Sequence, residues 1–293
     1  MFGTQQTMNL LENSDSIYVD GTLKIVPEIF FQLYTVHAVH PNGNVIPCVF
    51  ALLPNKTTET YVRLFTKLKE IRPYLNPVNA MIDFEKAAIN ALEQVFPQIQ
   101  VSGCFYHLSQ SIYRTVQSKG LQNLYCQSAE FALHARMIAA LAFVPLPDVA
   151  RAFEELQESS PPDLEPVIDY FEDNYIGRRR RRNRGRPFFS HNLWNMHERA
   201  ANEMPKTNNV VEGWHRKMVS SVNASHPNFW SFLEVLKREQ TLSNVVNNQA
   251  EAGQEPTKQK AKNKNCAQRI CNLDYNNHNI LNFLRGIAHN LSL

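Results

Sequence analysis

The sequence predicts a mixed α/β fold in which three antiparallel strands precede alternating helices and strands. The first observation is a pair of β-rich runs separated by Asn42-Gly43, a dipeptide typical of hairpins. The second is a pair of helical apolar patterns, ended by Pro73 and Pro97, with a short apolar run between them. The third is composition, because 293 residues that are 43% hydrophobic and 10% aromatic can bury a full α/β core.

Eight elements follow in the order βββαβαβα. The predicted strands lie at 16–24, 30–39, 45–53, 78–82 and 98–103. The predicted helices lie between Thr57 and Pro73, between the fourth strand and Pro97, and from about Leu108 to Tyr125. This order gives a mixed five-stranded sheet with helices on its faces, as in the ribonuclease H-like fold.

Two aspartates occupy related places in this predicted sheet. Asp20 lies in the first strand, beside Gly21, and Asp83 ends the fourth strand. These two strands are neighbours in a ribonuclease H-like sheet. We therefore expect both carboxylates to meet at one edge of the sheet.

A third acid, Glu212, lies at the start of a later helix. Asn208 and Asn209 are good helix caps, and helix-forming residues follow them. Glu212 is then in the first turn, where it can serve as the second half of a capping box with the backbone N–H of Asn209. A role beside the two aspartates is the alternative.

Four motifs carry a resemblance to a known family: Val19–Thr22, Ile82–Ala87, Gly103–His107 and Thr207–Glu212. In this order and setting they resemble the Mutator-like element (MULE) transposase domain, from about Ser16 to about Gln249. The resemblance implies a DDE-type DNA transposase. Its catalytic and metal-binding triad would be Asp20, Asp83 and Glu212.

Three carboxylates suit the reaction that this resemblance implies. Cleavage of a DNA phosphodiester and attack of the freed 3′-OH on target DNA both pass through a highly charged transition state. Two Mg²⁺ or Mn²⁺ ions, roughly 3.5–4 Å apart, can activate the nucleophile and neutralise the leaving oxygen, and such ions take oxygen ligands. We expect Asp20 to bridge both ions and Asp83 and Glu212 to hold one each. The expected partner is double-stranded DNA, as transposon ends and target.

The acids also have local interpretations that need no metal. Asp20 beside Gly21 can be a turn residue, and Asp83 can cap the helix that follows it. Glu85 and Glu93 belong to that helix, and we expect both to be solvated.

The role of the Cys104-x-x-His107 motif is left open by its composition. Its two soft ligands are fewer than the four of a structural zinc site, so we expect no zinc in this chain. A buried thiol with a helix-cap histidine is the local interpretation, whereas the MULE resemblance implies a recurring C-x-x-H motif near the active site or DNA. His215 is a possible proton or phosphate partner, and Trp214 is expected in the core.

A helical insertion is expected before the last helix, because the span from Asp83 to Glu212 is about twice that from Asp20 to Asp83. Five segments result. They are a frayed N-terminus at 1–15, the first part of the core at 16–127, the insertion with a basic loop at 128–187, a return to the core at 188–249, and a polar linker and tail at 250–293. Within the last, 251–265 are expected to be disordered and a short helix to follow.

The insertion ends in a run of arginines: Arg178, Arg179, Arg180, Arg181, Arg182, Arg184 and Arg186. Their mutual repulsion predicts a flexible loop. The net charge is only +3, so the case for nucleic acid rests on this local cluster. Arginine forks bind phosphates well, and we expect contact with the DNA backbone and possible use as a nuclear localisation signal; a solvated loop is the alternative.

Two functions are compatible with these patterns. The first is a metal-dependent DNA transposase core in the nucleus, working as a possible homo-oligomer. The second is a non-catalytic DNA- or protein-binding derivative, favoured by the absence of an N-terminal zinc-binding module ahead of the first strand. Five scattered cysteines suit a reducing compartment, and no apolar run reaches membrane-spanning length.

Overall fold

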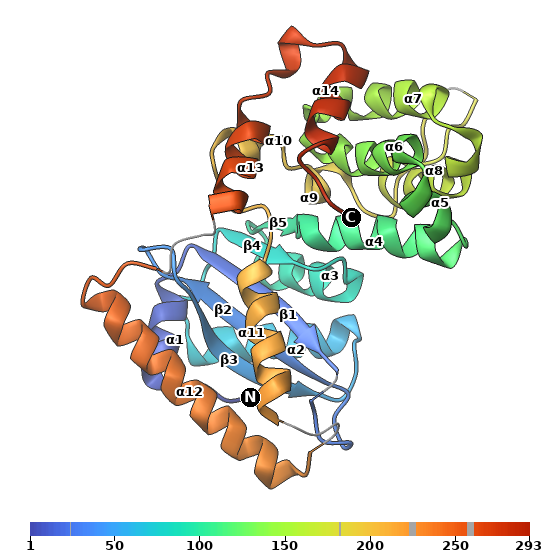
Figure 1. The fold of residues 1–293 in the computed structure, drawn as a ribbon. Coiled ribbons are helices and arrows are strands. Elements are labelled where there is room, and N and C mark those ends of the chain that lie inside the picture. Colours follow the sequence, from blue (N-terminus) through green and yellow to red (C-terminus); the bar gives the residue numbers. More distant parts are fainter. Residues whose placement is uncertain (24, 182, 223–226, 257–260) are drawn as a thin grey trace. The chain divides into compact units, whose positions relative to one another are not determined.

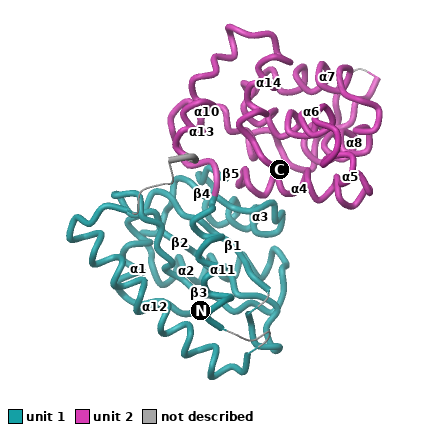
Figure 2. The backbone as a smooth tube through the Cα atoms, in the orientation of Figure 1, with its two compact units in different colours: residues 1–102, 208–258 teal, residues 103–207, 259–293 magenta. Residues whose placement is uncertain are grey.

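A computed structural model describes residues 1–293 except 24, 182, 223–226 and 257–260. The chain forms two compact units (Figure 2). Unit 1 comprises 1–102 and 208–258, and unit 2 comprises 103–207 and 259–293. Within the described residues, none of the helices combines the length and apolar character that crossing a bilayer requires.

Unit 1 is built on a mixed five-stranded sheet. Its strands are β1 (Ser16–Thr22), β2 (Gln32–Val39), β3 (Val45–Leu53), β4 (Asn79–Ile82) and β5 (Gln100–Gly103). Their order is β3-β2-β1-β4-β5, with β1–β2 and β2–β3 antiparallel and β1–β4 parallel. The predicted α/β class and the five predicted strands are confirmed, and the sheet is compatible with a ribonuclease H-like fold.

Helices cover both faces of this sheet (Figure 1). Those of unit 1 are α1 (Gln5–Glu12), α2 (Thr58–Ile71), α3 (Lys86–Val95), α11 (Asn209–Val222) and α12 (Phe229–Glu251). Successive strand residues point to opposite faces. Accordingly, Tyr34 of β2 packs against Tyr61 of α2 with ring centroids 4.9 Å apart, while Thr35 approaches His215 of α11.

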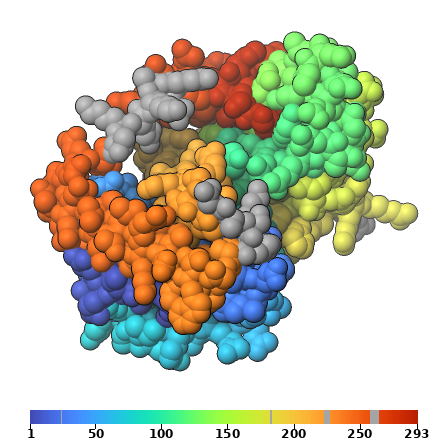
Figure 3. Space-filling view, turned by 60° about the horizontal axis from the view of Figure 1, so that its bottom comes forward, coloured from blue at the N-terminus to red at the C-terminus, as the bar shows by residue number. Residues whose placement is uncertain are grey.

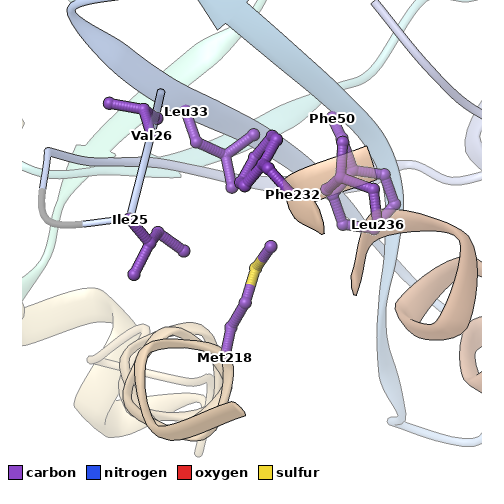
Figure 4. Close-up of a cluster of buried hydrophobic side chains, with 7 residues drawn as sticks. All are labelled: Ile25, Val26, Leu33, Phe50, Met218, Phe232 and Leu236. Atoms are coloured by element: carbon purple, nitrogen blue, oxygen red, sulfur yellow. The ribbon is translucent and has the colours of Figure 1, made fainter. Parts of the chain in front are cut away.

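One apolar cluster fixes α11 and α12 to the sheet (Figure 4). It joins the segment after β1, strands β2 and β3, and both helices, through Ile25, Val26, Leu33, Phe50, Met218, Phe232 and Leu236. All seven side chains are at most 3% exposed, so each contributes roughly 1.5–3 kcal/mol of burial. The opposite side of α12 lies on the surface of the molecule (Figure 3).

The N-terminus is ordered, so the predicted frayed end is wrong. The Thr4 side chain caps α1 and forms a capping box with Thr7, and Met8 and Leu11 are buried. Phe2 pairs with Phe50 in an antiparallel bridge to β3. The helix has only one short apolar face, which is why its periodicity is weak in the sequence.

Unit 2 is helical, as predicted for the insertion. Its helices are α4 (Phe105–Ser118), α5 (Gln122–Gln127), α6 (Ala129–Ala140), α7 (Val149–Ser159), α8 (Glu165–Phe171), α9 (His191–Trp194), α10 (His197–Ala201), α13 (Ala261–Cys271) and α14 (Ile280–Ala288). A π-helical turn, Glu172–Ile176, extends α8.

The limits of unit 2 differ from the expected boundaries at 127/128, 187/188 and 249/250. Helix α4 belongs to unit 2 because it packs against α6 and α8. Helix α14 belongs there because its apolar side packs against α6 and α7. The polar segment is also more ordered than expected: residue 251 ends α12, and 261–265 begin α13, while 257–260 lie outside the described residues.

Candidate active site

The pairing of β1 with β4 determines where the two aspartates lie. Ile17 is opposite Ala80 and Tyr18 is opposite Met81. Continuing this register brings Asp20 opposite Asp83, which directly follows β4. Adjacent strands are about 4.8 Å apart, so the two residues lie side by side at the carboxyl ends of parallel neighbours.

Asp20 is only 4% exposed, and each of its carboxylate oxygens lies near a nitrogen atom. Oδ1 accepts a hydrogen bond from the Gly21 backbone N–H at 2.8 Å. Oδ2 lies 3.3 Å from Nδ1 of His215 on α11, within ion-pair distance but without hydrogen-bond geometry. The Gly21 contact is local, whereas the His215 contact depends on the docking of α11.

His215 also contacts buried polar side chains of β2. The Nε2 atom of His215 is 3.3 Å from Oγ1 of Thr35, which is also 3.0 Å from Nε2 of His37. Thr35 Oγ1 lies 3.2 Å from the carbonyl oxygen of Asp20, to which it can donate. Burial, and then the nearby His215, hold the pKa of His37 well below its usual value, which favours a neutral ring.

Trp214, predicted to lie in the core, is partly buried and packs against the core cluster. Its ring centroid is 5.7 Å from that of Phe50 and 5.3 Å from that of His37. Its indole N–H donates to Oε2 of Glu239, a buried residue of α12, at 3.1 Å. Trp214 therefore ties α11 to both β3 and α12.

Glu212 does not occupy the position that a capping box requires. The Asn208 carbonyl accepts the N–H groups of Val211 and Glu212, so Asn208 caps α11 and Asn209 is its first helical residue. The third helical position is then Val211. Glu212 is thus the fourth helical residue rather than the third, and it is a half-buried side chain one turn before His215.

Glu85, predicted to be solvated, is instead held in a polar network on the other face of the sheet. Its side chain is 14% exposed, pairs with Lys56 Nζ at 2.8 Å, and accepts a hydrogen bond from the Tyr61 hydroxyl. Tyr61 in turn accepts a hydrogen bond from the Gln32 side chain at 2.6 Å. Glu93 is exposed, as predicted.

Sequence reasoning missed Lys56, Tyr61 and Gln32 because they lie outside every motif and far from Glu85 in the chain. A buried tyrosine, Tyr34, lies beside this network. Burial, followed by the charge of Asp83, raises the pKa of its hydroxyl well above the usual value. The sheet edge that carries Asp20 and Asp83, here called the acidic edge, is therefore bordered by neutral tyrosine side chains on the face covered by α2.

The chemistry of the aspartate pair fits a divalent cation. Mg²⁺ is commonly bound by one or two carboxylates, with water and substrate phosphates completing its shell. Asp20 and Asp83 offer such a pair in register, and Asp20 Oδ2 is buried without a hydrogen bond that meets geometric criteria. No group of three His, Cys, Asp or Glu side chains is close enough to hold a metal in the described part of the chain. Thus the structure does not bring Glu212 into a three-residue ligand group.

The Cys104-x-x-His107 motif opens α4 in unit 2. Cys104 is fully buried and takes the position preceding the helix, which confirms the buried thiol. His107 is the third residue of the helix rather than its cap, so that interpretation is wrong. Its ring lies 5.5 Å from that of Tyr106.

The described part of the arginine run forms a hairpin, whereas the sequence predicted a loop without regular pairing. Arg179 pairs with Arg184 in an antiparallel bridge, and Gly185 N–H donates to the Arg178 carbonyl at 2.8 Å. Mutual repulsion is offset by acids on α7, α8 and the π-helical turn. The pairs are Arg178 with Asp169, Glu172 and Asp173, Arg179 with Glu154, and Arg184 with Glu154 and Glu172.

These ion pairs divide the arginines into two sets. Arg178, Arg179 and Arg184 form ion pairs with acids of unit 2. Arg180, Arg181 and Arg186 form the second, exposed set. No acid within salt-bridge distance of the exposed set is found among the described residues, and Arg182 lies outside them. The exposed set remains available for an anionic partner.

Gly177 is needed where this hairpin begins. Its φ is +93°, and a Cβ atom there would lie 2.0 Å from the Gly185 carbonyl oxygen. We expect Gly177→Ala to lower the free energy of unfolding, measured by urea titration, by ~1–3 kcal/mol or more. Gly120→Ala is the control, because Gly120 has φ +73° but nothing within 4 Å. Equal losses in the two variants would contradict the steric account.

The fold is that of an α/β domain, and its candidate catalytic residues, Asp20 and Asp83, lie at the carboxyl ends of β1 and β4. Residues 16–111 match the family model of the MULE transposase domain, so this third of the chain is similar to that family. The matched segment includes Asp20, Asp83, Cys104 and His107, and ends before Glu212. Comparison with curated proteins gives no match.

Proposed function

We propose that the chain is a metal-dependent DNA transposase domain that cleaves DNA strands and transfers a 3′-OH to target DNA. The observation that carries the proposal is the register of β1 and β4, which puts Asp20 opposite Asp83 inside the segment that matches the MULE transposase domain. Hard oxygen donors on adjacent strands suit Mg²⁺ or Mn²⁺.

In this proposal Asp20, Asp83 and Glu212 hold up to two divalent ions. When bound, such ions supply an activated nucleophile and neutralise charge on the leaving oxygen. The chain's own contribution is orientation. Gly21 N–H and His215 contact the Asp20 carboxylate, and Glu212 lies on α11, the helix that carries His215.

Nicking of supercoiled DNA by the full chain tests this function. We expect nicking and strand transfer in Mg²⁺ or Mn²⁺, loss of both in EDTA, and loss of both in Asp83→Ala with DNA binding retained. Glu93→Ala is the matched control, since it removes an exposed carboxylate from α3, the helix that follows Asp83. Cleavage by Asp83→Ala at the control's rate would refute the proposal.

A non-catalytic, DNA- or protein-binding derivative is the second candidate. It is favoured by one observation, namely that no three-residue ligand group forms among the described residues. DNA binding by the wild-type chain without any metal-dependent cleavage would select this candidate over the first.

For the DNA contact we propose Arg180, Arg181 and Arg186 as phosphate ligands. Each phosphate contact contributes a slope of about −0.9 to log K against log salt concentration. Arg180→Ala/Arg181→Ala is therefore expected to make this slope shallower by about 2 in fluorescence anisotropy titrations. Lys119→Ala/Arg151→Ala removes the same charge from exposed positions elsewhere on unit 2 and should leave the slope unchanged.

The remaining assignments are part of the same proposal. We propose a nuclear location, for which the exposed arginines are a candidate signal. Joining two DNA ends to a target favours more than one copy of the chain, so we propose a homo-oligomer on DNA.

A further inference from the structure

Helix α11 contacts the candidate metal site through a residue that is not one of its three acids. His215 is 7% exposed, and its Nδ1 lies 3.3 Å from Asp20 Oδ2. The other oxygen of Asp20 already accepts the Gly21 N–H. A bidentate or bridging carboxylate must present its oxygens in a fixed plane, and here the backbone fixes one oxygen and α11 the other.

The imidazole of His215 is itself held from two sides. Its Nε2 is 3.3 Å from Thr35 Oγ1, on the strand next to Asp20. Its ring lies against Trp214, with centroids 5.1 Å apart, and the Trp214 indole is bonded to Glu239 of α12. The direction of Nδ1 towards Asp20 is therefore set by contacts that do not involve the aspartate.

His215 follows Glu212 by one helical turn, so the two side chains are neighbours on α11. Docking this helix on β1 therefore brings His215 to Asp20. Residues that contact a metal-binding side chain without binding the metal typically change metal affinity by about 10–100-fold when removed.

We propose that His215 is a positioning residue that orients the Asp20 carboxylate for divalent metal through Nδ1. The inference rests on the proposed function, because it requires Asp20 to bind metal. It assigns no acid–base role to the imidazole. The contact with Asp20 is the one that matters for metal, and the contact with Thr35 serves to aim the ring.

Two amide substitutions distinguish the role of His215 Nδ1 from that of Nε2. The amide nitrogen of asparagine can take the place of Nδ1, and that of glutamine can take the place of Nε2. Calorimetric titration of the full chain with Mn²⁺ is expected to give His215→Asn an affinity close to wild type. His215→Gln and His215→Leu should bind Mn²⁺ about 10–100-fold more weakly.

Nicking kinetics supply a second readout. In His215→Gln, the KM for DNA should equal that of the wild type. At saturating DNA, the Mn²⁺ concentration that gives the half-maximal rate should rise by the factor that calorimetry gives. Wild-type Mn²⁺ affinity in His215→Leu, or equal losses in the asparagine and glutamine variants, would overturn the assignment and leave the proposed function standing. Absence of Mn²⁺ binding by the wild-type chain would overturn both.

Circular dichroism melting monitors whether each variant folds. If the His215 variants unfold, Thr35→Val provides the test, because it keeps the imidazole and removes the group that aims it. Its Mn²⁺ affinity is expected to fall, and an unchanged affinity in a folded Thr35→Val chain would overturn the proposal.

Discussion

Replacing Asp20 by asparagine is expected to reduce metal-dependent DNA cleavage by on the order of 10²–10³-fold, since a metal ligand supplies several kcal/mol of transition-state stabilisation. Asparagine keeps an acceptor for the Gly21 N–H and nearly the same volume, so β1 should fold normally. The loss should therefore appear in cleavage rate and Mn²⁺ affinity, with little change in the melting temperature.

Asp15→Asn is the matched control for this prediction. Asp15 is exposed and precedes the same strand, where only its backbone carbonyl bonds to the neighbouring segment. The control removes an identical charge without touching the acidic edge. Cleavage by Asp20→Asn equal to that of Asp15→Asn would exclude Asp20 from the active site.

The second large effect is expected for stability. In Glu172→Gln the Arg184 guanidinium loses its closest carboxylate, at 2.7 Å, while its side chain stays only 15% exposed. Breaking a largely buried ion pair typically costs about 3–5 kcal/mol. Because Arg184 keeps its pair with the more exposed Glu154, we expect a loss of at most ~3–5 kcal/mol in the free energy of unfolding. The arginine hairpin should also become sensitive to brief trypsin treatment.

Glu154→Gln is the control for this stability prediction. Glu154 also pairs with Arg184, at 3.0 Å, but its side chain is 37% exposed and solvent screens the pair. Glu154→Gln should therefore lower the free energy of unfolding by only about 0–1 kcal/mol. Similar losses in the two variants would show that burial of Glu172 is not what holds the hairpin.

Patterns along the chain were sufficient to predict the strands and the helices of unit 1 after β3. The Asn42-Gly43 hairpin and the apolar periods ended by Pro73 and Pro97 are local signals, and local geometry obeys them. The adjacency of β1 and β4, which carry Asp20 and precede Asp83, was also predicted, because strand order in a mixed sheet determines which strand ends are adjacent.

Long-range polar contacts could not be predicted in this way. The acids that neutralise Arg178 and Arg184 lie on helices whose order in space no sequence pattern encodes, so repulsion within the run suggested a loop. Glu85 was misjudged for the same reason, because its partner Lys56 is far away in the chain. The helix start at Asn208 was missed by one residue, as two adjacent asparagines make equally good caps.

The central claim is that Asp20 and Asp83 share a divalent ion. Anomalous diffraction from crystals of the full chain grown with Mn²⁺ tests it most directly. We predict a peak within about 2.0–2.6 Å of a carboxylate oxygen of each aspartate. A chain that binds Mn²⁺ elsewhere, with no peak between these two residues, would contradict the claim.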